Sequence, residues 1–380
     1  MRLIEFELLK LLKNKKMIFI VLSCFLFSIL FVGYNHYQHN RYIEDMIQSL
    51  QSDNAIANQK VEYLNKLKVL DESHKELLEY WGKEAVTTSY LKIYYSSPKL
   101  FEWEDILKQT NNRNLNLIVG YQKEYISIYT QSTESRIKDL ENEIILNNYL
   151  LEQHIETLLS PYYPSASNSI YLLNTKEVML IMMILFVVSI VDIFSGEIES
   201  GAYKLTYTSP YSRIQIIQAK ILVSSIFVSL LYIIVPVFVF IISRIITGYG
   251  CLQYPILINT LGYFQVIPVV KFIQLSFIYY WLFLIFFVFL CSLVFIAFKE
   301  STSIISVFSG LFLIVFLVSS SRSQSIINYL PLGSFDLITI LQFYGFNMLP
   351  LFFTLTIVYS GIVYVLDRIL IKQISFTGGK

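Results

Sequence analysis

Charged side chains of both signs lie between the second and third long apolar runs of the chain. Asp192, Glu197 and Glu199 supply carboxylates there, and Arg213 and Lys220 supply cations. Such groups form ion pairs and charged contact surfaces, but alone they provide neither a nucleophile nor a metal centre. Asp192 stands near the end of an apolar run, where an ionisable group is costly unless it reaches headgroups or a partner. We therefore expect a polar bracket of short helices that contacts a partner. The alternative is a solvated loop whose charges only set the topology.

The connecting segment 192–220 is interrupted at Ser209-Pro210. Proline has no backbone N–H and restrains the residue before it, so it marks a helix boundary. The run from Tyr211 to Lys220 is predicted to restart the chain as a helix that leads into the next apolar run. The charges would then lie where two membrane helices end.

Motifs for common catalytic sites are absent from the sequence. It contains no G-x-x-x-x-G-K-[ST] phosphate loop, no H-E-x-x-H and no G-x-S-x-G, so the usual Gly-rich cradle for ATP is missing. The three cysteines are far apart and make no disulfide framework: Cys24, Cys251 and Cys291. All four histidines fall between the first two apolar runs: His36, His39, His74 and His154. Of these, His36 and His39 could share a helix face, but two ligands do not make a metal site, and we expect none.

The composition indicates an integral membrane protein. Hydrophobic residues make up 55% of the 380 residues, charged residues only 15%, and the mean hydropathy is +0.55. A soluble enzyme would carry charge at about a quarter of its positions, and a disordered chain would be poorer in large apolar residues. Both classes are excluded.

Six apolar runs are each close to the ~20 residues that cross a hydrocarbon core roughly 30 Å thick. They lie at about 17–34, 178–191 with a continuation past Asp192, 221–243, 272–298, 301–321 and 349–366. The stretch 245–270 also lacks charge until Lys271, but its Gly, Pro, Asn and Gln residues favour a re-entrant or interfacial loop over a seventh span. We therefore predict an α-helical integral membrane protein with six transmembrane helices.

The distribution of charge predicts the orientation. With six spans, twelve basic residues fall on one side of the membrane and three, in short loops, on the other. By the positive-inside rule both termini are then cytoplasmic. Residues 35–177 hold 14 Lys and Arg against 20 Asp and Glu, a net charge of −6, which leaves +7 for the rest. We expect residues 35–176 to form a mostly helical extracellular domain. It would be inserted between residues 1–34, which hold the first span, and residues 177–380, which hold spans two to six.

A seven-residue spacing of apolar residues marks a helix within this domain: Ile137, Ile144, Leu151 and Leu158, with Leu140 beside them. This spacing predicts a helical seam. We expect it to pack on an earlier helix marked by Val61, Leu64, Leu67 and Leu70.

The first sixteen residues, MRLIEFELLKLLKNKK, have apolar side chains on one face of a helix and charged ones on the other. This pattern is typical of a helix that lies in the inner membrane interface before the first span. A plain cytoplasmic extension of that span is the alternative.

The residues of the connecting segment resemble a known signature. An acidic pair, a Gly, a Leu, a Ser-Pro-x-Ser-Arg and a Lys follow one another at Glu197, Glu199, Gly201, Leu205, Ser209, Pro210, Ser212, Arg213 and Lys220. This looks like the cytoplasmic signature of ABC-2 type transporter permeases, the membrane subunits of a class of ABC exporters. The basic start with Glu7 and Lys10 is similar to the elbow helix of that family. The sequence departs from the pattern at Ala202, where Thr is frequent, and at Ile198, where Arg is frequent.

The resemblance implies a division of labour between chains. The connecting segment would be a coupling helix that docks into a groove on a separate ABC ATPase subunit, which would bind ATP and Mg²⁺. Two such ATPases and a second permease, identical or related, would complete the working unit. The chain itself would then not be an enzyme, would hold no cofactor, and would move its cargo by alternating access.

The spans hold little charge beyond Asp192, which favours an amphipathic or hydrophobic cargo such as an antimicrobial peptide, a lipid-like molecule or a drug. The acidic domain would attract a cationic peptide. An alternative function is a membrane sensor whose extracellular helices bind a peptide and signal to a cytoplasmic partner. No nucleic-acid partner is expected. The scarcity of Ala and Gly, with abundant Ile, Lys, Asn and Tyr, indicates an AT-rich genome and favours the plasma membrane of a Gram-positive bacterium.

Overall fold

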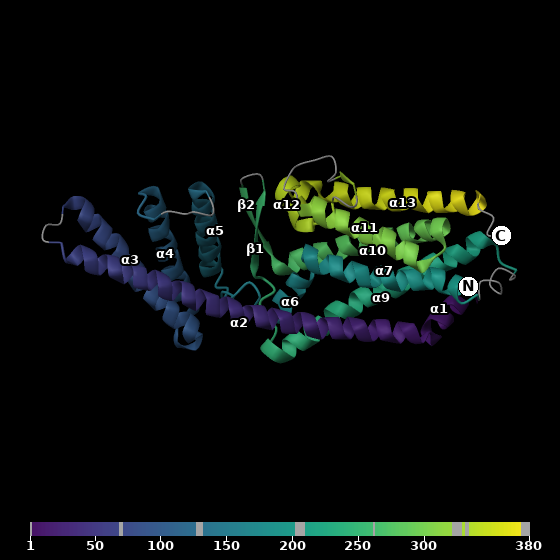
Figure 1. Cartoon of the computed structure of the whole chain (residues 1–380), viewed down its shortest axis with the longest axis horizontal. Helices are drawn as coiled ribbons and strands as arrows, with labels where there is room; N and C mark the ends of the chain where they lie inside the picture. The colour runs from purple at the N-terminus through teal and green to yellow at the C-terminus, as the bar shows by residue number, and fades with distance from the viewer. Residues whose placement is uncertain are drawn as a thin grey trace. The chain divides into compact units, whose positions relative to one another are not determined.

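The computed structural model describes most of the chain, namely residues 2–67, 71–126, 132–201, 210–260, 263–320, 329–330 and 334–373. It is almost entirely helical (Figure 1). The chain divides into two compact units. We call residues 1–32, 165–249 and 256–380 the apolar unit, and residues 33–164 and 250–255 the inserted unit.

The long helices of the apolar unit coincide with the predicted apolar runs. They are α2 (Lys15–Asn65, which continues into the inserted unit), α7 (Lys176–Glu199), α9 (Arg213–Thr247), α10 (Val269–Phe298), α11 (Ser301–Ser320) and α13 (Leu349–Gln373). Shorter elements are α1 (Arg2–Lys13), α6 (Ala166–Leu173), α12 (Leu337–Tyr344) and the 3₁₀ turn η3 (Phe346–Met348). An uncharged run in lipid is expected to be helical, because a helix satisfies each backbone N–H and C=O within its own segment.

Five helices in the described residues are long and apolar enough to cross a membrane: α2, α7, α9, α10 and a span from Phe346 to Lys372 that includes α13. The remaining predicted span is a helix as well, α11, which at 20 residues is shorter than these five. A count of six spans therefore stays a prediction, while the α-helical membrane class is confirmed.

Helix α10 lies at the centre of the apolar unit. It contacts α6, α7, α9, α11 and α13. Its large side chains Tyr279, Tyr280, Phe283 and Phe287 are fully buried. A helix that is apolar on every side is expected in such a position, because each face can pack against a neighbour.

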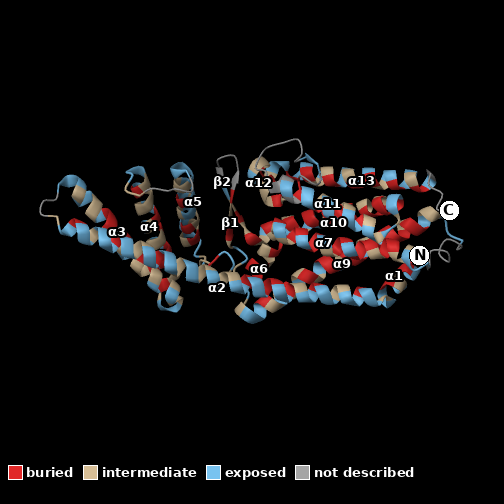
Figure 2. Cartoon of the chain, in the orientation of Figure 1, coloured by how far each residue is buried: buried red, intermediate tan, exposed pale blue. Residues whose placement is uncertain are grey.

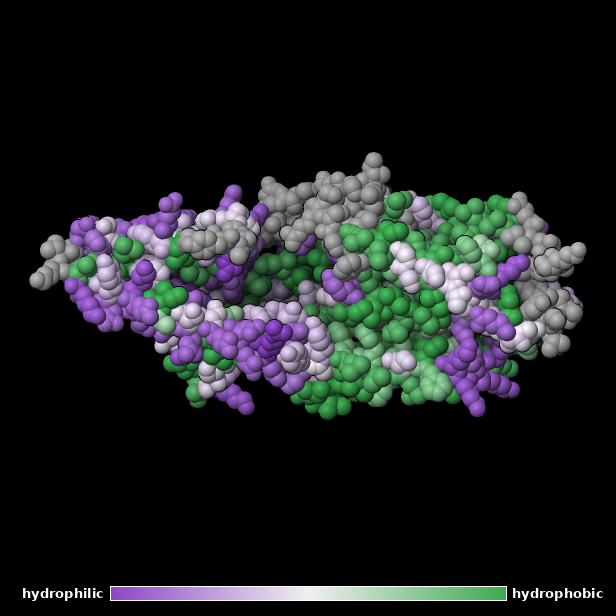
Figure 3. Space-filling view, viewed as in Figure 1, coloured by the Kyte–Doolittle hydropathy of each residue, from purple (hydrophilic) through white to green (hydrophobic). Residues whose placement is uncertain are grey.

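The other long helices divide their surfaces between the core and the surroundings (Figure 2). In the most apolar stretch of α7, 67% of the residues are buried, whereas in the corresponding stretch of the last span only 22% are buried. The exposed remainder is apolar, and Figure 3 shows hydrophobic side chains gathered over the helices of this unit. Large exposed apolar surfaces are unfavourable in water and natural in lipid, which is consistent with a membrane environment.

The stretch 245–270 differs from the expected loop. After α9 ends, the strands β1 (Pro255–Thr260) and β2 (Tyr263–Pro268) form a two-stranded sheet that leads into α10. Ile258 and Ile267 are buried in the core of the apolar unit. The β-branched and aromatic residues of both strands favour extended backbone, a signal that the Gly and Pro residues obscured.

The inserted unit contains α3 (Glu72–Ser96), the 3₁₀ turn η1 (Pro98–Leu100), α4 (Trp103–Gln122) and α5 (Thr133–Glu152), together with the later part of α2. Its surface is largely hydrophilic (Figure 3). The predicted domain 35–176 is thus close to this unit, but the residues from Ser165 onward, including α6, belong to the apolar unit. Its placement outside the cell stays a prediction.

The prediction that α5 packs on the helix around Leu64 is wrong. Helix α5 packs on α4, and its buried residues are Leu140, Asn147 and Leu150. The Asn147 side chain donates to Asn111 of α4 at 2.9 Å. Apolar spacing alone missed this contact because paired amides satisfy one another when buried. Leu64 packs instead with residues of α3, such as Tyr80 and Trp81, and the predicted Leu70 lies outside the described residues.

Arg113 joins three helices of the inserted unit. Its guanidinium bonds Glu84 of α3 at 2.9 Å and Asp53 of α2 at 2.6 Å. Glu84 is buried and also accepts from Asn116 at 3.3 Å. A rigid guanidinium suits this role because its N–H groups fan out to two carboxylates at once.

Candidate functional site

Helix α1 is separated from α2 at Asn14. The Asn14 side chain accepts from the backbone N–H of Lys16 at 3.0 Å, which caps the start of α2. Helix α1 then packs against α9. Helix α1 is therefore not continuous with α2, while its position, in the inner interface or in the cytoplasm, stays a prediction.

Glu197, near the end of α7, is bound by two lysines. Its carboxylate lies 2.7 Å from the Lys220 ammonium of α9 and also pairs with Lys10 of α1. Glu197 is 5% exposed and Lys220 is 3% exposed. Lys220 in addition lies 3.4 Å from the backbone carbonyl oxygens of Ile193 and Phe194. A buried charge needs this degree of compensation because the bare ion would pay a large desolvation penalty.

Glu7 of α1 extends the arrangement. It is buried and accepts from Lys10 at 3.2 Å. We call Glu7, Lys10, Glu197 and Lys220 the ionic cluster. Its alternating charges join α1, α7 and α9, three helices that are far apart in sequence.

Asp192 forms a second contact between α7 and the start of α2. Its carboxylate lies 2.6 Å from the Lys16 ammonium and accepts from the Asn14 amide at 3.2 Å. A cavity of about 300 Å³ lies between these groups and the ionic cluster. The two contacts bind α1 and the break after it to α7.

Glu199 and Gly201 end helix α7. Glu199 is exposed and accepts from the backbone N–H of Ser301 at 3.2 Å, so it caps the first turn of α11. Gly201 has a φ of +74°, a left-handed conformation that residues with a Cβ adopt at a cost. The chain leaves the helix at this residue.

Ser212 begins helix α9 with a capping box. Its hydroxyl accepts from the backbone N–H of Gln215 at 3.3 Å, and the Gln215 side chain accepts from the Ser212 N–H at 2.9 Å. Pro210, Tyr211 and Ser212 are exposed, and Arg213 is half-buried. A cavity of about 320 Å³ beside them is lined by α1 and α9.

The predicted site residues thus fall into two groups. Asp192, Glu197 and Lys220 make contacts inside the unit, whereas the exposed group consists of Glu199, Gly201, Pro210, Ser212 and the half-buried Arg213. Leu205 and Ser209 lie outside the described residues. The sequence suggested one polar bracket. It did not reveal that Lys10, 187 positions earlier, completes the environment of Glu197.

Asp367 of α13 is a buried carboxylate that the sequence reasoning did not single out. One oxygen accepts from Ser292 of α10 at 2.8 Å, and the other has no partner among the described residues. Its position just beyond the last apolar run, next to Arg368, made it resemble an ordinary residue at the end of a span.

Replacing Asp367 by asparagine is expected to stabilise the apolar unit by about 1–2 kcal/mol. The amide oxygen can still accept from Ser292, and no carboxylate has to be kept in the apolar core. Thermal unfolding of the detergent-purified chain measures the effect. A lower midpoint for Asp367→Asn would show that the carboxylate is held by interactions other than this one bond.

His36 and His39 make polar contacts within the inserted unit. His39 bonds the Ser160 hydroxyl at 2.7 Å, and His36 contacts Asn40 at 3.4 Å. In the described part of the chain no three His, Cys, Asp or Glu side chains gather in a way that could hold a metal ion. The three cysteines are free thiols.

Comparison with known proteins adds one match. A family model described as an ABC-2 family transporter protein matches residues 1–370. No curated protein sequence matches the chain significantly. The matched range covers both units and every residue of the candidate site. It therefore confirms the resemblance inferred from the connecting segment and extends it across the inserted unit.

Proposed function

The chain belongs to the ABC-2 transporter family, and on this premise we propose that it is the membrane subunit of an ATP-driven exporter. Members of this family are membrane subunits without a nucleotide-binding domain. ATP and Mg²⁺ would then bind to a separate ABC ATPase. The observation that carries the proposal is that helix α9 has exposed polar residues at its start and, seven residues later, Lys220 of the ionic cluster.

The exposed residues around the start of α9 are proposed as the docking surface for the ATPase. Pro210, Tyr211, Ser212 and Arg213 precede or begin a capped, 35-residue helix that enters the membrane unit. A force applied at such a capped helix start would reach Lys220 within two turns, before the internal Pro236. Glu199 lies at the end of α7 and would contribute a carboxylate to the same surface.

The ionic cluster would transmit this movement to other helices. Lys220 is seven residues into α9 and is held by Glu197 of α7, which also binds Lys10 of α1. A push on α9 would therefore move α7 and α1 with it. Alternating access requires helices that move as packed bodies between two arrangements. Two permeases and two ATPases would form the working unit.

The proposed cargo is amphipathic or hydrophobic. The central helix α10 has no charged residue between Phe272 and Phe298. The buried charges of the described residues pair with one another or lie near helix ends, as the ionic cluster does. A highly charged solute would find no counter-charge along such a path.

Charge reversal at the docking surface tests the proposal. The variant Arg213→Glu, co-expressed with the ATPase that functions with this chain, is expected to reduce co-purification and the stimulated ATP turnover at least tenfold. Loss of a contact across an interface of this kind costs about 2–5 kcal/mol. Arg213 is preferable to Glu197 as a target, since reversing a buried charge would disrupt the fold itself.

The matched control is Lys60→Glu, an exposed cation of α2 that belongs to the inserted unit. It makes the same charge change away from the proposed surface and should leave co-purification and ATP turnover unchanged. Equal effects of both variants would argue against docking at the start of α9. Failure of the unmodified chain to bind any ABC ATPase would overturn the function itself.

A further inference from the structure

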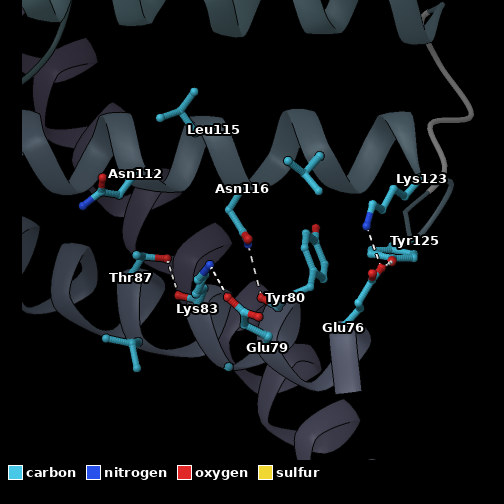
Figure 4. A pocket seen from close by; sticks show the side chains of 13 residues that line it. Glu76, Glu79, Tyr80, Lys83, Thr87, Asn112, Leu115, Asn116, Lys123 and Tyr125 are labelled. Carbon is cyan, nitrogen blue, oxygen red and sulfur yellow. Dashed lines mark hydrogen bonds and ion pairs between the residues drawn. The ribbon is translucent and has the colours of Figure 1, made fainter. Parts of the chain in front are cut away.

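A cleft of about 860 Å³ lies along one side of the helix pair α3 and α4 in the inserted unit (Figure 4). From Glu76 to Thr87 its lining follows α3 for about 16 Å, the length of roughly five extended residues. The facing wall comes from α4, where Asn112 and Asn116 supply amide groups. None of the residues used in the proposed transport mechanism lies in this cleft.

Aliphatic side chains line the cleft and are open to it. Val86 is 69% exposed, Leu115 is 53% exposed and Val119 is 41% exposed. They come from both helices and share the cleft with the buried ring of Tyr80. Exposed apolar groups gathered in a concave site are typical of a binding surface, because a ligand can cover them all at once.

Two carboxylates lie at the same end of the cleft, one helical turn apart. Glu76 pairs with Lys123 at 2.6 Å, and Glu79 pairs with Lys83 at 2.6 Å (Figure 4). Hydrogen bonds from Lys123 and then Tyr125 lower the pKa of Glu76, and Lys83 lowers the pKa of Glu79. Both carboxylates therefore carry charge at neutral pH. Ion pairs this exposed contribute little, so a cation from a ligand can replace either lysine.

We propose that this cleft binds a short cationic amphipathic peptide. Its aliphatic side chains would cover Val86, Leu115 and Val119, and its ammonium or guanidinium groups would bind Glu76 and Glu79. The net charge of −6 on residues 35–177 favours the approach of a cation over that of an anion. This inference rests on the proposed function and deepens it, since it names the class of cargo that the transporter would first encounter.

The probe is an eight-residue peptide of alternating lysine and leucine that carries a fluorophore. Its binding to the full-length chain in a neutral detergent is followed by fluorescence anisotropy. We expect saturable binding that the double variant Glu79→Gln with Leu115→Asn weakens at least tenfold. Raising the salt from 50 to 500 mM should also weaken it. A glutamate–leucine peptide of the same length is expected not to bind.

The matched control is Glu62→Gln with Leu100→Asn in the same unit. Glu62 forms an exposed pair with Lys66 at 2.6 Å over the same four-residue spacing as Glu79 and Lys83, and Leu100 is an exposed leucine outside the cleft. The control should bind the peptide as tightly as the unmodified chain. All four substitutions are at exposed positions, so each variant is expected to keep its thermal midpoint.

Three outcomes would overturn the inference: no saturable binding, equal loss in the cleft variant and the control, or equal affinity for the glutamate–leucine peptide. Co-purification with the ATPase is measured on the same variants. If the peptide does not bind while the ATPase still does, the cleft is not a peptide site and the transporter function stands. If the peptide binds while the ATPase does not, the cleft is a peptide site and the transporter function is overturned.

Discussion

Glu197→Gln is expected to destabilise the apolar unit by about 3–5 kcal/mol, because it leaves the buried Lys220 ammonium without a counter-charge. The two carbonyl oxygens that Lys220 also contacts, each at 3.4 Å, are distant, neutral acceptors and do not replace the lost negative charge. Thermal unfolding of the purified chain in detergent should show a midpoint lower by roughly 10 °C. Poor expression of the variant would be the same effect seen in cells.

A double variant distinguishes the effect of the Glu197 charge on stability from the effect of its shape. Glu197→Gln combined with Lys220→Met removes both buried charges and should recover most of the lost stability, since apolar replacement of a complete buried pair is often nearly neutral. Lys10 then keeps Glu7 at 3.2 Å and is partly exposed, so it is not left unpaired. If the double variant is as unstable as the single one, the shape of Glu197 matters more than its charge. The exposed Glu199→Gln is the matched control and should shift the midpoint far less.

Arg113→Met is expected to destabilise the inserted unit by about 3–5 kcal/mol. Without the guanidinium, the carboxylate of buried Glu84 keeps only the bond from Asn116, and the ion pairs from α4 to Asp53 of α2 and to Glu84 of α3 are lost. Hydrogen exchange on the full chain should report faster exchange in α3 and α4. Arg113→Lys should rescue only part of the loss, since one ammonium cannot match the two-sided geometry of a guanidinium.

The control for Arg113 lies on the same helix. Lys108 forms an exposed pair with Asp105 at 3.4 Å, and Lys108→Met should change stability by less than about 0.5 kcal/mol. Equal exchange in the Arg113 and Lys108 variants would mean that the inserted unit does not depend on its buried charges.

Much of the helical architecture could be predicted because lipid imposes a strong rule on sequence. A run of about twenty uncharged residues has few alternatives to helix in a membrane, so all six runs appear as helices. The hairpin of β1 and β2 was missed because short apolar segments rich in Gly and Pro do not distinguish a strand from a loop. The partner of α5 was missed because Asn111 and Asn147 use buried amides where the pattern assumes apolar contacts.

The sequence predicted which residues make up the candidate site, but not which of them contact one another. The types and spacing of Glu197, Arg213 and Lys220 suggested the family that the match over residues 1–370 shows, whereas their role in coupling stays a prediction. Which charge is buried depends on helix packing, which no local pattern contains. Lys10 shows this most clearly, because its partner Glu197 is remote in sequence.

The ionic cluster also imposes an order on biosynthesis. Lys10 leaves the ribosome 187 residues before Glu197, and Lys220 follows Glu197 by 23 residues. At a synthesis rate of about 5–20 residues per second, helix α1 waits roughly 10–40 s before Glu197 exists. During that time residues 33–164 of the inserted unit are made, whereas Glu197 waits only about 1–5 s for Lys220. The pair between α7 and α9 can therefore form soon after both helices are made. Helix α1 is made first, yet it waits much longer for its contact with Glu197.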